Sequence, residues 1–274
     1  MSVQAPTQST STTPGLGTGW ATGVVGLFGV AVALTIVRLF LPLSQNSGWA
    51  DGELLVLAIV ASITALAKQL PVVNVVLAAG IAAGIGGVAH AVNDVTGLPF
   101  GRVEFTTVFG PRLLGVLPFA ILGLCVVETL SARGVARVAL QRWRDKPNHG
   151  YHVIGLAVVL MVVFHLAFNA FGSAVKGWWS QMSLPVVNTV SWGVLSLIIQ
   201  VLITPLLLDK FPGRRPPNFW PLIVWIALNI ILATGLFVAD RLAEALLVST
   251  VSGIIMALAL RTGNGTVTPT ARIT

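Results

Sequence analysis

The chain has 274 residues, of which 55% are hydrophobic and only 9% are charged, and its mean hydropathy is +0.89. Soluble domains carry roughly 25% charged residues, so this composition excludes an ordinary soluble domain and indicates a polytopic membrane protein. The formal net charge is +7, but the basic residues lie in short loops between apolar segments, which is typical of membrane orientation rather than nucleic-acid binding.

Apolar segments of about 20 residues, the length of a transmembrane helix, recur along the chain. They predict an all-α, polytopic integral membrane helix bundle with about eight transmembrane helices. The predicted spans are Trp20–Leu41, Glu53–Leu70, Val72–Val92, Leu113–Ser131, Tyr151–Phe171, Leu184–Leu208, Trp220–Ala239 and Leu242–Leu260. A disordered N-terminal lead (1–17) and a flexible C-terminal tail (262–274), both polar, are predicted to flank a single transmembrane helical domain over 18–261.

The basic residues predict that both termini are cytoplasmic. In that orientation eleven Lys and Arg residues lie inside the cell and five outside. Most of this bias comes from two short loops, 133–150 and 209–218, which are therefore expected to face the cytoplasm.

Two further patterns predict how the spans pack. Small residues at small-xxx-small spacing in the third span allow close helix approach, so this span is expected to be central. These residues are Gly80, Ala83, Gly84 and Gly87. Trp178, Trp179 and Trp192 cluster near the predicted outer interface, and most of them are interpreted as interfacial anchors.

The stretch 90–118 is polar and irregular in a chain that is otherwise almost all apolar. It follows a Gly- and Ala-rich segment, passes through two Gly/Pro turns and re-enters apolar sequence at Leu113. Lipid-buried backbone of this kind is tolerated only where protein or a water-filled cavity covers it. We therefore expect the functional site near this stretch, which we call the polar island.

Polar side chains in and near the spans strengthen this expectation, because ionisable groups at membrane depth are costly and usually functional. His90 and Asp94 are four residues apart, as are His165 and Asn169, so each pair shares a helix face. The other polar groups that fall in the same outer half of the membrane are Asn93, Glu104 and Asn188. Four different segments thus place polar groups at the same depth in the membrane, which predicts a cavity there.

Structural interpretations stay open for these residues. His165 can hydrogen-bond a neighbouring helix, and Asp94 can face water at a helix end. Glu128 lies late in the fourth span, near the cytoplasmic headgroups, and is expected to pair with Arg133 or Lys146 rather than to act in catalysis.

Absent motifs narrow the class of protein. Membrane di-iron enzymes need many histidines, and this chain has four. Isoprenoid-diphosphate transferases hold Mg²⁺ with repeated aspartates, and no second aspartate group follows Asp94 at the required spacing. There is no P-loop and no GxGxxG fingerprint, and the one cysteine, Cys125, lies in an apolar run. The sequence predicts no metal site and no cofactor.

The polar island resembles the signature of the membrane-bound carotenoid 1,2-hydratases. The resemblance rests on Thr96–Gly101 (TGLPFG), on RVEF at 102–105 and on GPRLLGV at 110–116, with a fainter similarity over 178–192. The chain departs from the family pattern at His90, where an acidic residue is expected, and at Val103 and Phe105, where tyrosines are expected. It therefore resembles a divergent member of the family.

The resemblance implies hydration of the terminal double bond of an acyclic carotenoid without a redox cofactor. Protonation of the alkene gives a tertiary cation that water captures, which requires an acid, a base and a dry pocket. A carboxyl group in a dry membrane cavity can keep its proton, and Asp94 or Glu104 is the expected acid. His90 or His165 is expected to hold the water or accept its proton.

Substrate binding is expected from amides that orient the water and from aromatic rings that line the polyene slot and stabilise the cation. These residues are Asn93, Phe100, Phe105, Asn169, Trp179 and Asn188. The expected substrate is a carotenoid or another isoprenoid lipid, the location is the bacterial inner membrane, and other carotenoid-pathway enzymes are possible partners. The alternatives are a non-catalytic transporter or isoprenoid-binding protein and, less favoured, a Mg²⁺-dependent prenyltransferase.

Overall fold

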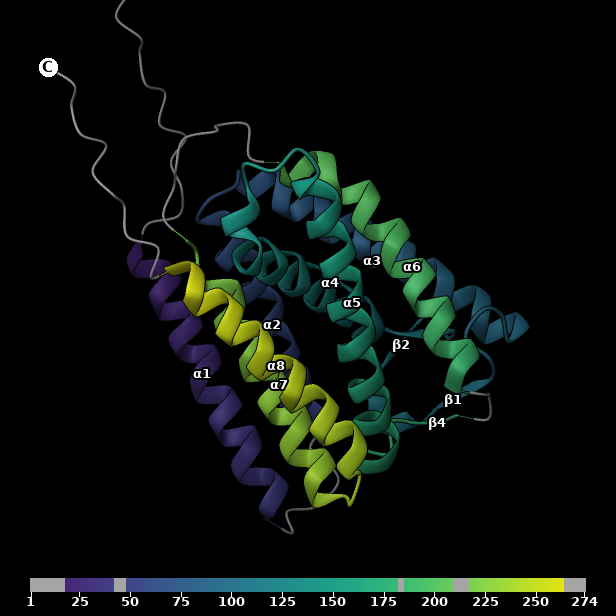
Figure 1. Ribbon diagram of the computed structural model, residues 1–274. Helices are drawn as coiled ribbons and strands as arrows, with labels where there is room; N and C mark the ends of the chain where they lie inside the picture. Colours follow the sequence, from purple (N-terminus) through teal and green to yellow (C-terminus); the bar gives the residue numbers. More distant parts are fainter. Residues whose placement is uncertain (1–17, 42–47, 182–184, 209–216, 264–274) are drawn as a thin grey trace, which may run out of the picture.

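The computed structural model describes residues 18–41, 48–181, 185–208 and 217–263. Within these residues eight helices are long and apolar enough to cross a membrane, which confirms the predicted fold class (Figure 1). They are α1 (Thr18–Phe40), α2 (Gly48–Ala67), α3 (Val72–Thr96), α4 (Phe119–Ala139), α5 (His149–Ala170), α6 (Pro185–Leu207), α7 (Trp220–Val238) and α8 (Leu242–Gly263). The chain is an integral membrane protein; its predicted N-terminal lead and most of its predicted tail lie outside the described residues.

α4 is the central helix of the bundle. It packs against α2, α3, α5, α7 and α8, and 72% of its most apolar stretch is buried, compared with 33% for α3. The prediction that the third span is central is therefore wrong. Small residues on several sides of α4 admit close neighbours: Gly123 faces Leu55 of α2, and Gly134 faces Pro221 of α7.

The contact between α3 and α4 uses different glycines from those predicted. A Cβ atom at Gly86 would collide with Cys125 of α4, and one at Gly87 would come within 2.5 Å of Leu122. Gly80 and Gly84, by contrast, have no such neighbour within 4 Å. Of the predicted seam, Gly87 is the glycine that lies against α4.

α4 begins six residues later than predicted, at Phe119 rather than Leu113. Residues 112–118 form a small hairpin instead, in which β2 (Arg112–Leu113) pairs with β3 (Leu117–Pro118). Pro118 precedes the first helical residue, and a proline inside the helix would remove a backbone donor and clash with the preceding turn. Gly115 has a φ of 76°, which helical backbone excludes.

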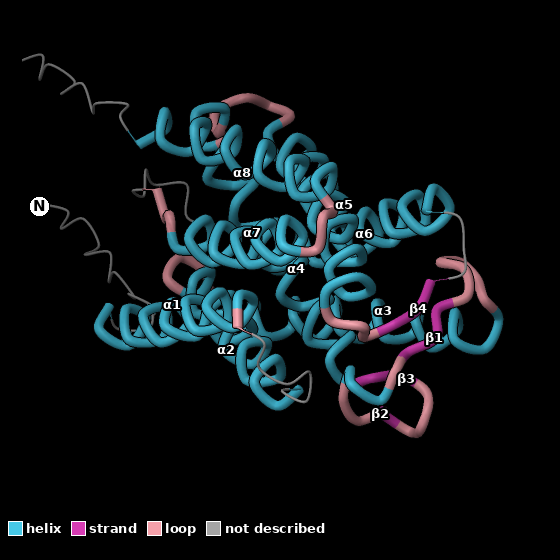
Figure 2. The backbone as a smooth tube through the Cα atoms, turned by 90° about the horizontal axis from the view of Figure 1, so that it is seen from below, coloured by secondary structure: helices cyan, strands magenta, loops and turns pink. Residues whose placement is uncertain are grey.

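Short elements of the polar island cover one end of the bundle (Figure 2). β1 (Val103–Phe105) pairs antiparallel with β4 (Trp179–Gln181), which follows a short π-helix, η3 (Phe171–Val175), at the end of α5. One short 3₁₀ helix, η1 (Thr107–Phe109), lies between β1 and β2, and another, η2 (Gln141–Trp143), lies between α4 and α5. The sequence predicted none of these strands: β1 and β4 lie between predicted spans, and β3 lies inside the predicted fourth span. Each strand is two or three residues long and too short for a visible alternation.

Candidate functional site

A small cavity of about 50 Å³, with several polar side chains in its wall, lies where the polar island meets α3, α4, α5 and α6. Seven of the ten predicted site residues line it. These are His90, Phe100, Phe105, His165, Asn169, Trp179 and Asn188. A cavity of this size holds one or a few water molecules and is too small for the end group of a lipid.

Asn188 connects three segments that are far apart in the sequence. Its Nδ2 donates to the carbonyl oxygen of Phe100 in the polar island (3.2 Å), and its Oδ1 lies 2.9 Å from Nε2 of His165 in α5. Because Nδ2 is committed to a carbonyl acceptor, Oδ1 faces the histidine and accepts a hydrogen bond. His165 therefore carries its proton on Nε2, and Nδ1 is the nitrogen that can accept a proton.

The carboxyl group in the cavity wall is Glu128, not one of those favoured from the sequence. It is 4% exposed, and its Oε1 accepts a 2.9 Å hydrogen bond from Nε1 of Trp192 in α6. The expected pairing with Arg133 is wrong: in the described part of the chain Glu128 has no cationic partner. Because α4 extends to Ala139, Glu128 lies near the middle of the helix rather than at the headgroups.

Asp94 and Glu104, the two expected acids, are both exposed and do not line the cavity. Glu104 lies between Val103 and Phe105 in β1, and successive side chains of a strand point to opposite faces, so those two line the cavity while Glu104 points away. Asp94 lies one helical turn beyond His90, past the cavity. The structure therefore does not support either residue as a buried acid.

Asn93, expected to bind substrate, instead holds the polar island in shape. Its Oδ1 accepts from the backbone N–H of Phe100 (2.7 Å), and its Nδ2 donates to the carbonyl of Gly101 (2.8 Å). Gly97 ends α3 in the left-handed conformation, with a φ of 73°. These features turn the chain so that the Phe100 ring, 1% exposed, enters the bundle.

Aromatic rings surround the polar groups of the cavity. The His165 ring stacks on Trp192 with centroids 4.3 Å apart, and the His90 ring stacks on Phe100 at 4.7 Å. Trp179 donates from Nε1 to Oδ1 of Asn169 (2.9 Å). Trp178, Trp179 and Trp192 are all buried, so their interpretation as interfacial anchors is wrong.

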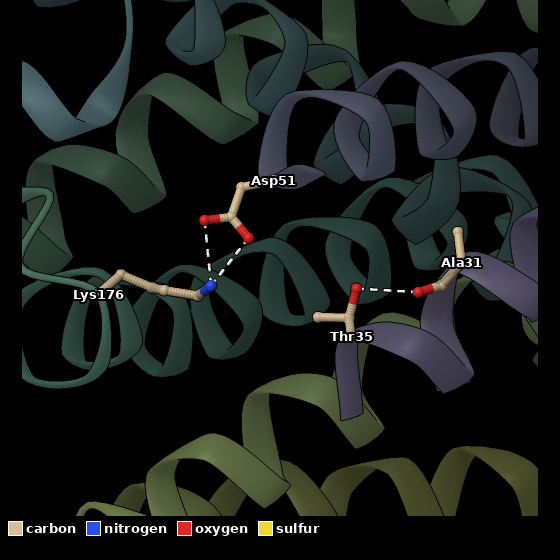
Figure 3. Close-up of polar contacts among 4 residues, drawn as sticks. All are labelled: Ala31, Thr35, Asp51 and Lys176. Carbon is tan, nitrogen blue, oxygen red and sulfur yellow. Dashed lines mark hydrogen bonds and ion pairs between the residues drawn. The ribbon is translucent and has the colours of Figure 1, made fainter. Parts of the chain in front are cut away.

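A second, larger cavity of about 380 Å³ lies beside the first, and the two share Leu124, Phe164 and Phe168 in their walls. This apolar chamber extends between α2, α4, α5 and α7. Its polar end is an ion pair in which Nζ of Lys176 lies 2.8 and 3.0 Å from the two carboxylate oxygens of Asp51 (Figure 3). Thr35, also in the wall, is hydrogen-bonded within α1 to Ala31 (Figure 3).

The comparison with protein families decides what the chain is. A model of the carotenoid biosynthesis protein family matches residues 51–256, which run from the start of α2 into α8. This range includes the small cavity and all of the chamber wall except Thr35. The chain belongs to this family. No curated protein and no solved structure matches it.

Membership of the carotenoid biosynthesis protein family confirms the resemblance at the level of this family. It supports a role in carotenoid biosynthesis, with an isoprenoid-related lipid as the substrate class. A chamber with an almost entirely apolar wall suits such a lipid. The cavity beside it is where this carotenoid biosynthesis protein brings ionisable groups together at membrane depth.

Sequence reasoning did not assign four residues to the site. Glu128 and Trp192 are 64 residues apart, and no periodic pattern relates them. Asp51 and Lys176 are 125 residues apart, although the predicted topology placed both at the same membrane face. Glu128 could have been singled out from the sequence, because it is the one acidic residue within the apolar fourth span.

Proposed function

We propose that this protein adds water to the terminal double bond of an acyclic carotenoid in the bacterial cytoplasmic membrane, with Glu128 as the acid. The observation that carries the proposal is a buried carboxyl group, bonded to Trp192 and without a cationic partner among the described residues, in a cavity that also contains His90 and His165. The group that protonates an alkene has to be shielded from bulk water and close to the reacting carbon. Glu128 is buried and so meets the first of these requirements.

The chemistry balances with these groups alone. The Glu128 carboxyl donates its proton to the less substituted carbon of the double bond, and the tertiary cation forms at the other carbon. A water molecule in the small cavity adds its oxygen to the cation, and its surplus proton passes to Nδ1 of His165. Return of that proton to Glu128 restores the starting state, so the net reaction consumes one water molecule.

The apolar wall of the chamber would bind the substrate, and the aromatic wall of the small cavity would stabilise the cation. The chamber has the volume of a typical small-ligand pocket, whereas the small cavity has not. We propose that the carotenoid end group occupies the chamber and that its double bond reaches Glu128 past the shared wall of Leu124, Phe164 and Phe168. The rings of Phe100, Phe105 and Trp179 would stabilise the cation through their faces.

The test is expression of the full chain in a lycopene-accumulating bacterium, followed by liquid chromatography and mass spectrometry of the pigments. A new, more polar pigment, heavier than lycopene by one water, supports the proposal. Unchanged pigments, with the protein shown to be in the membrane, contradict it for lycopene. Co-purification of unmodified carotenoid in that case favours the non-catalytic alternative, a carotenoid-binding or transport protein.

A further inference from the structure

A second polar cleft lies at the opposite end of α4 from the polar island. It has a volume of about 310 Å³ and is formed by the ends of α2, α4, α5, α6 and α7. Its basic residues are Arg133, Arg137, Arg144 and His149. The proposed hydration does not use this cleft, because the small cavity lies against the first half of α4 and the cleft lies against the second half.

Arg133 is the residue that points to a ligand. Its side chain is 3% exposed and lies in the cleft wall, yet its Nε and Nη1 atoms are buried without a hydrogen-bond partner in the part of the chain that the structure describes. A buried guanidinium with unused donors is costly, and proteins normally satisfy it with a carboxylate or another anion. In the same wall Nδ1 of His149 is also buried without a partner.

The electrostatics of the wall favour an anion. Among the described residues, three arginines line the cleft and no acidic residue does. α5 begins at His149 in this wall, and the first N–H groups of a 22-residue helix carry partial positive charge. Side-chain amides of Gln69, Gln141 and Asn218 add neutral polar groups around the arginines.

We propose that this cleft binds a phosphate group, carried either by an anionic membrane lipid or by a soluble phosphate compound. Guanidinium groups match phosphate oxygens with paired hydrogen bonds, which favours phosphate over a small halide. The wall joins apolar residues such as Val138, Val153 and Leu208 to the arginines, as a lipid headgroup site requires.

The probes are dioleoyl phosphatidylglycerol and pyrophosphate, added separately to the full-length, delipidated protein in neutral detergent. Phosphatidylcholine and potassium chloride of matched ionic strength are the controls. Thermal unfolding is followed by tryptophan fluorescence. We expect at least one phosphate probe to raise the Tm, and the apparent Kd to increase at least tenfold in Arg133→Met. Without a probe, Arg133→Met should be at least as stable as the wild type, because it removes an unpaired buried charge.

Arg142→Gln is the matched control variant, because Arg142 is exposed on the same connection and does not line the cleft. It should keep the wild-type response, whereas Arg144→Gln should weaken it even where Arg133→Met does not accumulate. A response to phosphatidylglycerol alone identifies a lipid headgroup, and a response to pyrophosphate alone identifies a soluble ligand. No response to either probe, or an equal loss in Arg142→Gln, overturns the proposal.

Discussion

At the scale of single residues, the bundle contains several buried polar side chains, and Glu128 differs from the others in its chemistry. Gln200 and Asn229 are comparably buried, and each donates from its amide to a carbonyl one helix away or one turn back. A neutral amide is therefore sufficient to fill polar space in this bundle. A carboxyl at position 128 adds the ability to give up a proton, which packing alone does not require.

Replacing Glu128 by Gln tests this distinction. The Gln side chain can still accept the hydrogen bond from Trp192, so we expect normal accumulation in the membrane. Hydration should fall by about 10²–10⁴-fold, the usual contribution of a positioned acid. The measurement is the amount of hydrated pigment relative to lycopene, normalised to the protein detected in the membrane.

Glu104→Gln and Asp94→Asn are the matched controls for Glu128→Gln, because both carboxyl groups are exposed and outside the cavity. Each should retain at least half of the wild-type activity. If either control loses activity while Glu128→Gln retains it, the acid is Asp94 or Glu104 in the polar island and not Glu128.

At the scale of elements, the contact between α3 and α4 sets the distance across the small cavity. α3 carries His90 and α4 carries Glu128, and Gly86 and Gly87 bring the two helices together one turn before His90. A side chain at either glycine would push the helices apart where the reaction is proposed to occur.

Gly86→Ala should therefore destabilise the protein by about 1–3 kcal/mol, the usual cost of overpacking a close contact. Gly84→Ala is the matched variant, because no neighbour lies within 4 Å and alanine favours the helix. Thermal unfolding in detergent should give a lower Tm for Gly86→Ala and an unchanged or higher Tm for Gly84→Ala. Equal Tm values would mean that α3 and α4 are not in close contact at this glycine.

The Asp51–Lys176 ion pair ties α2 to the segment that follows η3, at the polar end of the chamber. The two side chains are 15% and 17% exposed, so the pair lies between an exposed pair and a buried one. Lys176→Met should cost about 1–3 kcal/mol, because it leaves the Asp51 carboxylate without its partner. In a double-mutant cycle by thermal unfolding, adding Asp51→Asn should recover part of this loss; strictly additive effects would show that the pair contributes nothing.

The sequence predicted elements better than it predicted contacts between them. Hydropathy located all eight spans, because a bilayer demands about 20 apolar residues from every helix. It misplaced the start of α4, because residues 113–118 are mostly apolar but form a hairpin, with Gly115 in the left-handed conformation and Pro118 directly before the helix. The wrong position and pairing predicted for Glu128 followed from that shift, because a later helix moves the residue from the headgroup level to the middle of the span.

Local sequence patterns identified the region that lines the small cavity but not the carboxyl group that lies in its wall. The polarity and turns of 90–118 identified the island, and His90, Phe100 and Phe105 do line the cavity. Which carboxyl group joins them depends on how α4 and α6 pack. Trp192 and Glu128 meet only through that packing, and spacing within one segment carries no information about it.

At the scale of the whole molecule, the two ends of the bundle differ in charge and shape. The polar island and the small cavity occupy one end, and the arginine cleft occupies the other. The start of α1 and the end of α8 lie together at one end, as eight antiparallel crossings require (Figure 1). The charge distribution of the loops predicts that the arginine end faces the cytoplasm.

Cysteine labelling tests this orientation directly, because the native Cys125 is 2% exposed and should not react with a membrane-impermeant maleimide. Asp94→Cys and Arg142→Cys place single exposed thiols at opposite ends of the bundle. In intact cells from which any outer membrane has been removed, Asp94→Cys should be labelled, and Arg142→Cys only after lysis. The reverse pattern would invert the topology: the polar island would then face the cytoplasm, and the arginine cleft would meet the outer leaflet instead of the cytoplasmic phosphate compounds and anionic lipids proposed for it.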